Sequence, residues 1–401
     1  MRILQLSPQV PYPLVDGGKV SIFNITKYLA LRGHQITFLA LDRGGGADSP
    51  MEEFCKLVTV PHSNANSRIR ATRNLFSSIP YNLSKYQSGS YEAALTRILE
   101  AQKFDIVHVD YIHMAHYGLI CRKRSRLPLV LREHDVSSTI MERFAETLPF
   151  GPFKFYINTQ VRRIRKYEGA IASQYELCCA MSEEDKRRLM ELHPSARVEV
   201  IPAGVESSYF AIPQPAEAIP NSISFFGGLD WIPNQDALRW FLDSVFPIIQ
   251  KSQPDATLFI IGKSAPPDII ARQSKHVVLR GFVPDLKQEV QRYSVTIAPF
   301  RIGGGMRLKI LESFAMRIPV VSTSVGCEGI EAVPGKHLLV GDTVEEFASQ
   351  VLCLLRDHAL RRTLTENASK LAYRKYRWES VAEMFEKCYA EVIGRLEGAV
   401  R

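Results

Sequence analysis

A triple-glycine loop and the helix expected after it carry the clearest chemistry in this sequence. The loop is Gly303, Gly304 and Gly305, whose backbone N–H groups can approach a ligand closely. A helix that starts directly after the loop aims its unpaired N–H groups and positive dipole end at the same place. Three basic side chains surround the loop: Arg301, Arg307 and Lys309. Together these groups predict a receptacle for a doubly charged anion such as a diphosphate.

Glu312 follows Lys309 by three positions on the predicted helix, residues 306–317. An i,i+3 ion pair on a helix surface, contributing roughly a few tenths of a kcal/mol, explains this spacing without a ligand. Leu308, Leu311 and further apolar residues cover most of the helix circumference, as expected for a helix packed on a parallel sheet. From this segment alone, a ligand site and a structural loop are both open.

Alternating strands and helices must position such a loop, and they begin at the start of the chain. The first residues read as strand, loop, helix from about residue 21 to 32, and strand. Gly17 and Gly18 stand just before that helix, where a doubly wound α/β domain places its ligand loop. The turn lacks the G-x-G-x-x-G pattern, so it only weakly supports a dinucleotide site.

Two further apolar runs of the first half end in polar clusters. They are DIVHVDY (105–111) and LPLVLREHDVSS (127–138), the second of which contains His134 and Asp135. Such runs are typical of buried parallel strands whose following loops carry chemistry.

A linker rich in proline and alanine, residues 211–222, separates two sets of alternating strands and helices. The sequence therefore predicts two doubly wound, Rossmann-like parallel-sheet domains that face each other across a cleft. We expect an N-terminal domain over residues 1–210, a C-terminal domain over 211–375, and a final helix, 376–401, that crosses back to the first domain. Few turn signals interrupt the last helical region, residues 359–397.

Composition fits a cytoplasmic globular protein. The 401 residues are 46% hydrophobic and 23% charged, and no apolar run approaches the roughly 18 residues of a membrane span. The chain opens directly with a strand, MRILQLSP, whose apolar part is too short for a signal peptide. Seven cysteines without a C-x-x-C pair fit a reduced compartment better than disulfides or zinc.

The net charge of +8 belongs mostly to the first half, where residues 1–200 hold 27 Lys and Arg against 20 Asp and Glu. Three runs concentrate it, at residues 67–73, 122–126 and 161–166. An anionic membrane surface or an anionic acceptor would suit these runs, and a solvated face of helices explains them without a partner. No stacking pattern or nucleic-acid motif accompanies them, which disfavours nucleic acid.

The order of segments resembles a known family. The GG loop, EHD, AMSEED, VIPAGVESSYF, GFVPDL and KILESFAMRIPVVSTSVGCEGI are similar to the retaining glycosyltransferases of the GT-B fold, specifically glycosyltransferase family 4. The resemblance covers nearly the whole chain. It implies transfer of a sugar from a nucleotide-diphosphate sugar to a glycan, glycolipid or small-molecule acceptor, in cell-surface polysaccharide or glycolipid synthesis, at the inner face of the membrane and with no further cofactor.

The resemblance also implies roles for single residues. Glu312 matches the family glutamate that binds the ribose hydroxyls, and Glu328 lies where members often hold a second glutamate near the ribose. Gly18 matches a glycine whose backbone approaches the donor phosphates, and His134 matches a histidine at the acceptor side of the donor sugar. The segment that borders the nucleobase matches Gly281, Phe282 and Val283.

Two departures from the family pattern move the expected phosphate site. The family's first glutamate would fall at Gly304, and its basic diphosphate clamp would fall in GGLDWIPNQDAL, which has no basic residue before Arg239. Arg301, Arg307 and Lys309 would then take the cationic role, with the glycine loop holding a phosphate.

The chemistry implied is stabilisation of a diphosphate leaving group by Lys309, Arg307 and the helix N-terminus. No D-x-D sequence occurs, so we expect metal independence. His134 would orient the sugar or stabilise charge, although a histidine hydrogen-bonded at a strand end explains it equally. Asp135 would position His134 or bind acceptor.

Two other functions remain open at this point. A catalytically silent, nucleotide-binding scaffold is suggested by Gly304 and the missing clamp, while the presence of both Lys309 and Glu312 argues against it. A dinucleotide-dependent oxidoreductase would also use two doubly wound domains, and the absence of G-x-G-x-x-G counts against that function.

Overall fold

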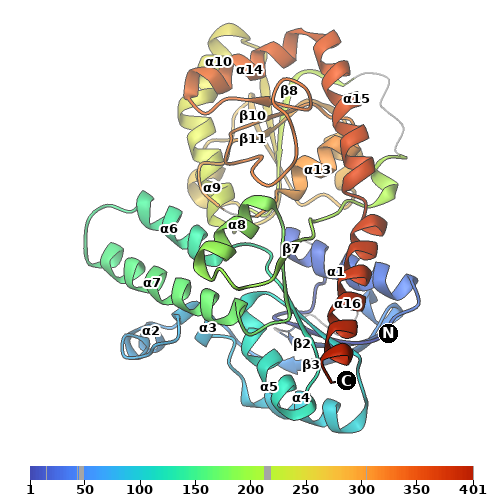
Figure 1. Ribbon diagram of the computed structural model, residues 1–401. Helices are drawn as coiled ribbons and strands as arrows, with labels where there is room; N and C mark the ends of the chain where they lie inside the picture. Colours follow the sequence, from blue (N-terminus) through green and yellow to red (C-terminus); the bar gives the residue numbers. More distant parts are fainter. Residues whose placement is uncertain (15, 43, 45–48, 212–217, 304, 401) are drawn as a thin grey trace. The chain divides into compact units, whose positions relative to one another are not determined.

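The chain divides into two compact units. The computed structural model describes residues 1–401 except 15, 43, 45–48, 212–217, 304 and 401 (Figure 1). Unit 1 combines Met1–Pro202 with Glu379–Arg401, and unit 2 is Ala203–Trp378. The last helix therefore belongs to the same unit as the first strand.

Unit 1 is built on a seven-stranded parallel sheet of order β3-β2-β1-β4-β5-β6-β7. Its strands are β1 (Arg2–Ser7), β2 (Gln35–Asp42), β3 (Lys56–Pro61), β4 (Ile106–Asp110), β5 (Leu129–Arg132), β6 (Leu177–Ala180) and β7 (Val198–Val200). Its helices are α1 (Gly17–Leu31), α2 (Arg68–Asn74), α3 (Tyr81–Ser84), α4 (Gly89–Ala101), α5 (Ala115–Ser125), α6 (Ser137–Thr147), α7 (Pro152–Ala172), α8 (Glu183–Leu192) and α16 (Trp378–Val400).

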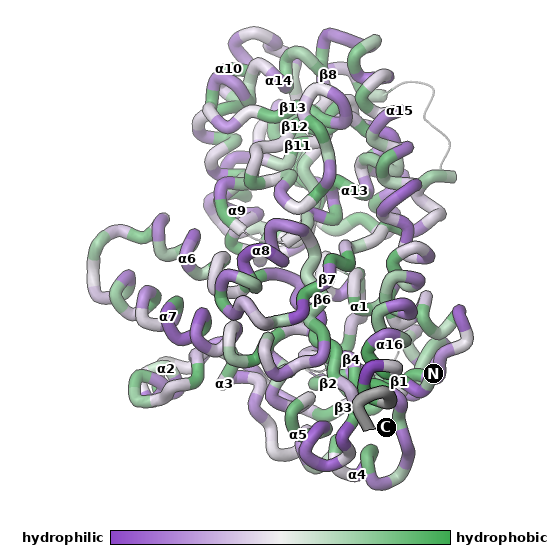
Figure 2. The backbone as a smooth tube through the Cα atoms, in the orientation of Figure 1, coloured by the Kyte–Doolittle hydropathy of each residue, from purple (hydrophilic) through white to green (hydrophobic). Residues whose placement is uncertain are grey.

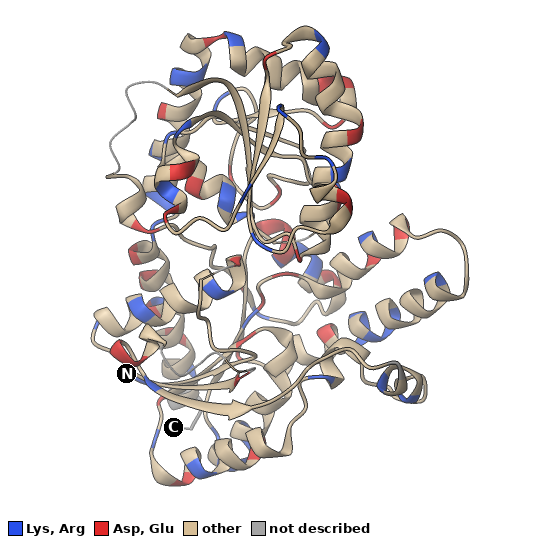
Figure 3. Ribbon diagram, turned by 180° about the vertical axis from the view of Figure 1, so that it is seen from behind, with Lys and Arg blue, Asp and Glu red and all other residues tan. Residues whose placement is uncertain are grey.

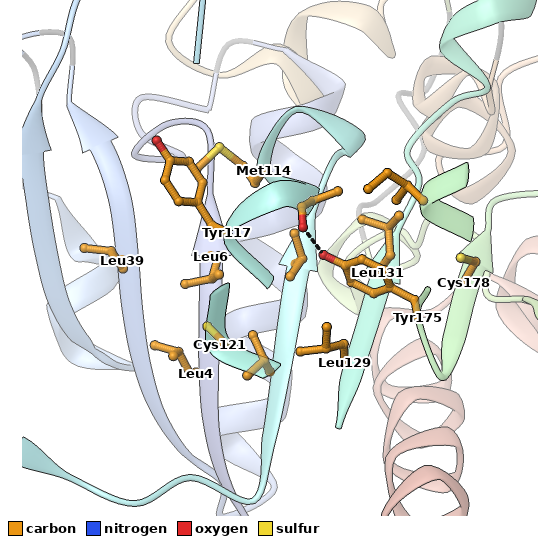
Figure 4. Packing of buried hydrophobic residues seen from close by; sticks show 14 of the residues in the cluster. Leu4, Leu6, Leu39, Met114, Tyr117, Cys121, Leu129, Leu131, Tyr175 and Cys178 are labelled. Carbon is orange, nitrogen blue, oxygen red and sulfur yellow. Dashed lines mark hydrogen bonds between the residues drawn. The ribbon is translucent and has the colours of Figure 1, made fainter. Parts of the chain in front are cut away.

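Alternate residues of the unit 1 strands face two different helical layers. Leu39 and Leu41 of β2 pack into the core that α4 and α5 cover, and Figure 4 shows Leu39 with Tyr117 and Cys121 of α5 in this core. Phe38 and Ala40 of the same strand pack with α1. This period of two is why the strands read as continuous apolar runs, since both faces of the sheet are buried. In Figure 2 the hydrophilic residues lie mainly along the helices.

Unit 2 repeats the architecture with a six-stranded parallel sheet of order β10-β9-β8-β11-β12-β13. Its strands are β8 (Ile219–Phe226), β9 (Thr257–Ile261), β10 (Val277–Gly281), β11 (Tyr293–Ala298), β12 (Val320–Ser322) and β13 (Leu339–Val340). Its helices are α9 (Ile232–Trp240), α10 (Phe246–Ser252), α11 (Pro267–Ile270), α12 (Leu286–Val290), α13 (Leu308–Ala315), α14 (Val344–Arg356) and α15 (His358–Lys375). The expected pair of Rossmann-like α/β domains is confirmed.

The division between the units falls earlier than the expected boundary at residues 210 and 211. Residues 203–210 belong to unit 2 because they form hydrogen bonds and packing contacts with it. The Val205 N–H donates to the Tyr376 carbonyl (2.6 Å), and Gly204 lies directly against the buried Trp378 ring. Six residues of the predicted linker, 212–217, lie outside the described residues.

Two predicted helix boundaries were wrong. The first helix begins at Gly17, because the Asp16 side chain caps it by accepting from the Lys19 N–H. The helix after the glycine loop is shorter than 306–317, since Arg307 is its extended N-cap residue. The expected final helix, 376–401, corresponds to α16, which Tyr376 and Arg377 separate from α15.

Thiols and helices of the structure agree with its composition. All seven cysteines are free. Among the described residues, no helix is both long enough and apolar enough to cross a membrane.

The contact between Gly204 and Trp378 makes a stability prediction. A Cβ atom at residue 204 would lie 2.5 Å from the indole Cδ2, so Gly204→Ala must displace a buried ring and should cost about 1–3 kcal/mol. Gly394→Ala is the matched control, because nothing lies within 4 Å of its new Cβ. Urea unfolding followed by fluorescence measures both, and equal midpoints would contradict the proposed clash.

Candidate functional site

In each sheet the order of strands reverses between two central strands, β1 and β4 in unit 1 and β8 and β11 in unit 2. Loops that follow the carboxyl ends of parallel strands at such points are the usual ligand-binding places of doubly wound sheets. Gly18 follows β1, His134 follows β5, and the glycine loop follows β11. The predicted residues therefore form one cluster in each unit.

Gly18 and His134 of the unit 1 cluster are joined by a residue that the sequence analysis did not select, Tyr111. The Tyr111 and His134 rings stack with centroids 4.0 Å apart. A Cβ atom on Gly18 would lie 2.1 Å from the Tyr111 hydroxyl, so the position admits only glycine while the ring stays in place. Tyr111 itself has φ +66°, a left-handed conformation that is costly for a bulky residue.

The Asp110 carboxylate accepts a hydrogen bond from His134 and fixes the orientation of its ring. Its Oδ1 accepts from His134 Nε2 (3.1 Å) and His108 Nε2 (3.3 Å), and its Oδ2 accepts from Gln5 Nε2 (2.7 Å). With Nε2–H donating, His108 Nδ1 accepts from the hydroxyl of Tyr389 on α16. The last helix thus contributes to a buried chain of hydrogen bonds that ends at His134.

Burial and charge set the protonation of this chain. Burial alone would favour the neutral form of Asp110, but His108 and then His134 hold the pKa of that carboxyl well below its ordinary value. Burial, aided by the Arg132 guanidinium, lowers the pKa of His134 to about 4. At neutral pH the structure therefore presents a neutral imidazole bound to an ionised carboxylate.

Asp135 was expected to position His134 or bind acceptor. His134 Nε2 donates to Asp110 instead. Asp135 accepts from the hydroxyl of Ser137 at the start of α6 (3.2 Å). Its part in acceptor binding stays a prediction.

Lys309 is the centre of the unit 2 cluster. Its Nζ donates to Asn234 Oδ1 (3.1 Å) and lies 4.0 Å from the Phe225 ring centroid and 4.8 Å from that of Phe300. Gly227, at the end of β8, comes so close that a Cβ there would lie 3.0 Å from this Nζ. Cation–π contacts and one amide oxygen thus replace most of the water around the ammonium group.

The buried side chain of Arg307 contacts the glycine loop. The buried Arg307 guanidinium donates to the Gly305 carbonyl, and a Cβ on Gly303 would lie 2.7 Å from its Nη2. Gly303 (φ +124°) and Gly305 (φ +67°) both adopt conformations that favour glycine. Gly304, the position of the missing family glutamate, lies outside the described residues.

Arg301, the third predicted cation, is committed to a partner. Its guanidinium forms an ion pair with Asp236 of α9, with Nη2 and Oδ1 2.5 Å apart. Arg239, the first basic residue after the expected clamp, likewise pairs with Asp268 (2.7 Å). Of the three predicted cations, Arg301 forms this ion pair, whereas the contacts of Arg307 and Lys309 described above are with neutral groups.

Glu312 and Lys309 each have a partner of their own rather than an i,i+3 ion pair. Glu312 Oε1 accepts from the hydroxyl of Tyr209 (3.4 Å), in the first residues of unit 2. Burial raises the pKa of Glu312 to about 7, opposed by Tyr209 and Lys309. Burial, followed by repulsion from Arg307, lowers the pKa of Lys309 to about 7. Both groups titrate near neutrality, as is common at functional sites.

The remaining predicted residues lie around the same edge of unit 2. Gly281 ends β10 with φ +66°, Phe282 is 67% exposed, and Val283 packs into a small core with Phe226. Glu328 lies half-buried in the turn after β12. An exposed aromatic ring beside a positive-φ glycine provides a flat apolar surface.

Sequence reasoning missed Asp110, Tyr111 and Asn234. The first two end the run DIVHVDY, so their position after a buried strand was the available signal. Asn234 occurs in the segment where a basic clamp was expected, and only the fold places it beside Lys309.

Two family models match the chain. The model described as Glycosyltransferase Family 4 matches residues 15–209. The model described as Glycosyl transferases group 1 matches residues 220–357. Together they account for most of the chain.

Relatives and solved structures cover almost the full length. An uncharacterized 44.6 kDa protein in the cps region of Klebsiella pneumoniae is 20% identical over 395 residues, 94% of this chain and 96% of that protein. A sucrose-phosphate synthase from Thermosynechococcus elongatus has TM-score 0.70 at 15% identity, covering 98% and 100% of the two chains. Anabaena HepE, solved with UDP and glucose, has TM-score 0.68 at 16% identity, covering 97% and 99%. These structures share the GT-B fold.

The low pKa of His134 predicts how stability depends on pH. In the unfolded chain a histidine protonates near pH 6.5, whereas folded His134 resists protonation down to about pH 4. The unfolded state therefore binds more protons between these values, and acidification from pH 7 to 5 should remove about 2 kcal/mol of stability through this residue. His134→Gln, which keeps a donor to Asp110, should lose that much less on acidification, measured by urea unfolding. A histidine NMR titration midpoint near 6.5 for His134 would contradict this.

Proposed function

We propose, from the premise that the chain belongs to the glycosyltransferases of the GT-B fold, that it is a retaining and metal-independent enzyme. It transfers a hexose from a nucleoside diphosphate to an acceptor hydroxyl. The observation that carries this proposal is the first turn of α13, where Lys309 and Glu312 follow the glycine loop with separate, uncharged hydrogen-bond partners.

The surroundings of Lys309 support its proposed role, which is to stabilise the leaving diphosphate. Its ammonium group is surrounded by aromatic rings and one amide, so an incoming phosphate meets a poorly solvated cation. Charge developing on the β-phosphate strengthens that contact as the glycosidic bond breaks. The glycine loop adds backbone N–H groups, while Arg307 holds the loop in shape through the Gly305 carbonyl. Protein cations thereby do the work that other glycosyltransferases give to a metal ion.

Glu312 supports recognition of the ribose. A half-buried carboxylate that accepts one weak hydrogen bond, from Tyr209 at 3.4 Å, has lone pairs left for two sugar hydroxyls. The exposed Phe282 offers its ring to the nucleobase. HepE of similar fold was solved with UDP, which favours a nucleoside diphosphate as the ligand of this half.

Unit 1 supplies the residues for the transferred sugar and the acceptor. The neutral His134 imidazole, held by Asp110, is suited to accept or donate a hydrogen bond to a sugar hydroxyl without bringing a charge. Gly18, at the start of α1, lets the Tyr111 hydroxyl approach the backbone closely. The relative in the cps region of Klebsiella pneumoniae favours a role in surface polysaccharide synthesis.

Ligand-induced stabilisation tests the proposal. A thermal-shift panel of UDP, GDP, ADP, dTDP and NADH should show stabilisation by at least one nucleoside diphosphate, since a ligand that binds only the folded state raises the melting temperature. Glu312→Gln should abolish that shift while leaving the melting temperature of the free protein nearly unchanged. Stabilisation by NADH alone would overturn the transferase function, and no shift with any nucleotide would contradict nucleotide binding at this site. The anomeric configuration of the product, determined by NMR, tests retention.

The pKa of Lys309 predicts a pH dependence of donor binding. Above pH 7.5 a free nucleoside diphosphate no longer changes its charge, while Lys309, with a pKa of about 7, loses its remaining proton. Affinity should therefore fall between pH 7.5 and 9, approaching tenfold per pH unit. Lys309→Arg keeps the positive charge and should flatten the profile. Calorimetric titration measures both proteins, with Lys251→Arg as the control. Parallel profiles for the three proteins would place the phosphate elsewhere.

A further inference from the structure

The helical hairpin of α6 and α7 ends in an exposed aromatic tip. The hairpin projects from the rest of unit 1 in Figures 1 and 3. At its turn, Phe150 is 102% exposed, Phe153 58% and Phe155 75%. Single exposed apolar residues are ordinary, but a group of large aromatic side chains at one projecting turn marks an interaction surface.

The tip phenylalanines are not needed to hold the hairpin together. α6 and α7 have a small core of their own: Ala145, Ile157 and Val161, with Met141, Phe144, Leu148 and Tyr156 packed against it. The Lys154 ammonium closes the turn by donating to the Leu148 carbonyl (3.0 Å). The exposed rings therefore add apolar surface to a turn that is already fixed.

A second exposed apolar segment, at the end of α2, is hydrogen-bonded to the hairpin. Arg163 of α7 donates to the carbonyls of Asn74 (2.8 Å) and Leu75 (2.7 Å), at the end of α2. The next residue, Phe76, is 93% exposed, and Ile69 on α2 is 69% exposed. The end of α2 and the hairpin thus form one surface, here called the hairpin surface.

Basic residues outnumber acidic ones on the hairpin surface, where α6 contributes Glu142 and Glu146. Residues 149–167 contain five Lys and Arg and no Asp or Glu, and residues 61–81 contain three Arg and none of the acids. On α7, Phe155, Arg162 and Lys166 stand at helical spacings that share one face, and all are exposed. Arg70 and Arg73 are exposed on α2. Figure 3 shows the basic residues along the projecting helices.

We propose that the hairpin surface docks on an anionic lipid bilayer. The phenylalanine rings would enter the boundary between headgroups and acyl chains, and the arginine and lysine side chains would bind anionic headgroups. A second copy of this chain would bring like charges together. An acidic polymer in solution would satisfy the cations but leave the rings in water. The bilayer is the partner that matches both properties, and this holds whatever reaction the enzyme performs.

Vesicle flotation of the full chain tests the proposal. The protein should bind vesicles of phosphatidylcholine with phosphatidylglycerol and should not bind pure phosphatidylcholine, with binding weakened by salt. Phe150→Ser, Phe153→Ser and Phe155→Ser combined should lower the partition coefficient at least about tenfold, and Arg162→Glu with Lys166→Glu should do the same. The matched controls are Leu31→Ser for exposed apolar area and Lys123→Glu with Arg124→Glu for charge, and both should bind like the wild type.

Insertion of the aromatic tip into the bilayer can be detected directly by fluorescence. Tryptophan placed by Phe150→Trp should be quenched by phospholipids brominated on the acyl chain. Equal vesicle binding by the wild type and the triple serine variant would overturn the proposal. So would a wild-type dimer that the triple variant converts to a monomer in light scattering, or binding to soluble polygalacturonate that the serine substitutions leave unchanged in strength.

Discussion

The burial of the Lys309 ammonium group against aromatic rings is the constraint on which the unit 2 site depends. A cation that gives up water loses solvation energy, and the amide of Asn234 and the faces of Phe225 and Phe300 return only part of it. Phe225 lies on β8, Asn234 in the first turn of α9 and Phe300 just after β11. The cluster therefore forms because the strand order places β8 beside β11, and it leaves the buried charge of Lys309 incompletely compensated.

Unit 1 shows the opposite arrangement at the same place in its sheet. There the buried charge is a carboxylate, Asp110, and it is fully provided with donors by Gln5, His108 and His134. A satisfied charge of this kind attracts no ligand itself. Its effect is to fix the orientation and the protonation of the imidazole that it contacts.

The sequence predicted those features that depend on local patterns. Buried parallel strands, the glycine loop and the helix bearing Lys309 and Glu312 follow from runs of apolar residues and their punctuation. Partners that come from distant segments could not be predicted. Arg301 meets Asp236, and Tyr389 reaches His108 from the far end of the chain. Such contacts depend on strand order, which single residues do not encode. Helix starts were missed where a cap decided them, as at Asp16.

The return of α16 to unit 1 determines when that unit can finish folding during synthesis. His108 and Arg132, buried in strands made in the first third of the chain, contact Tyr389 and Phe385 of the last helix. A ribosome has therefore completed unit 2 before the first unit receives its final packing layer. Until then, buried polar groups of the early strands lack their cover, which makes the nascent first unit a natural client for chaperones.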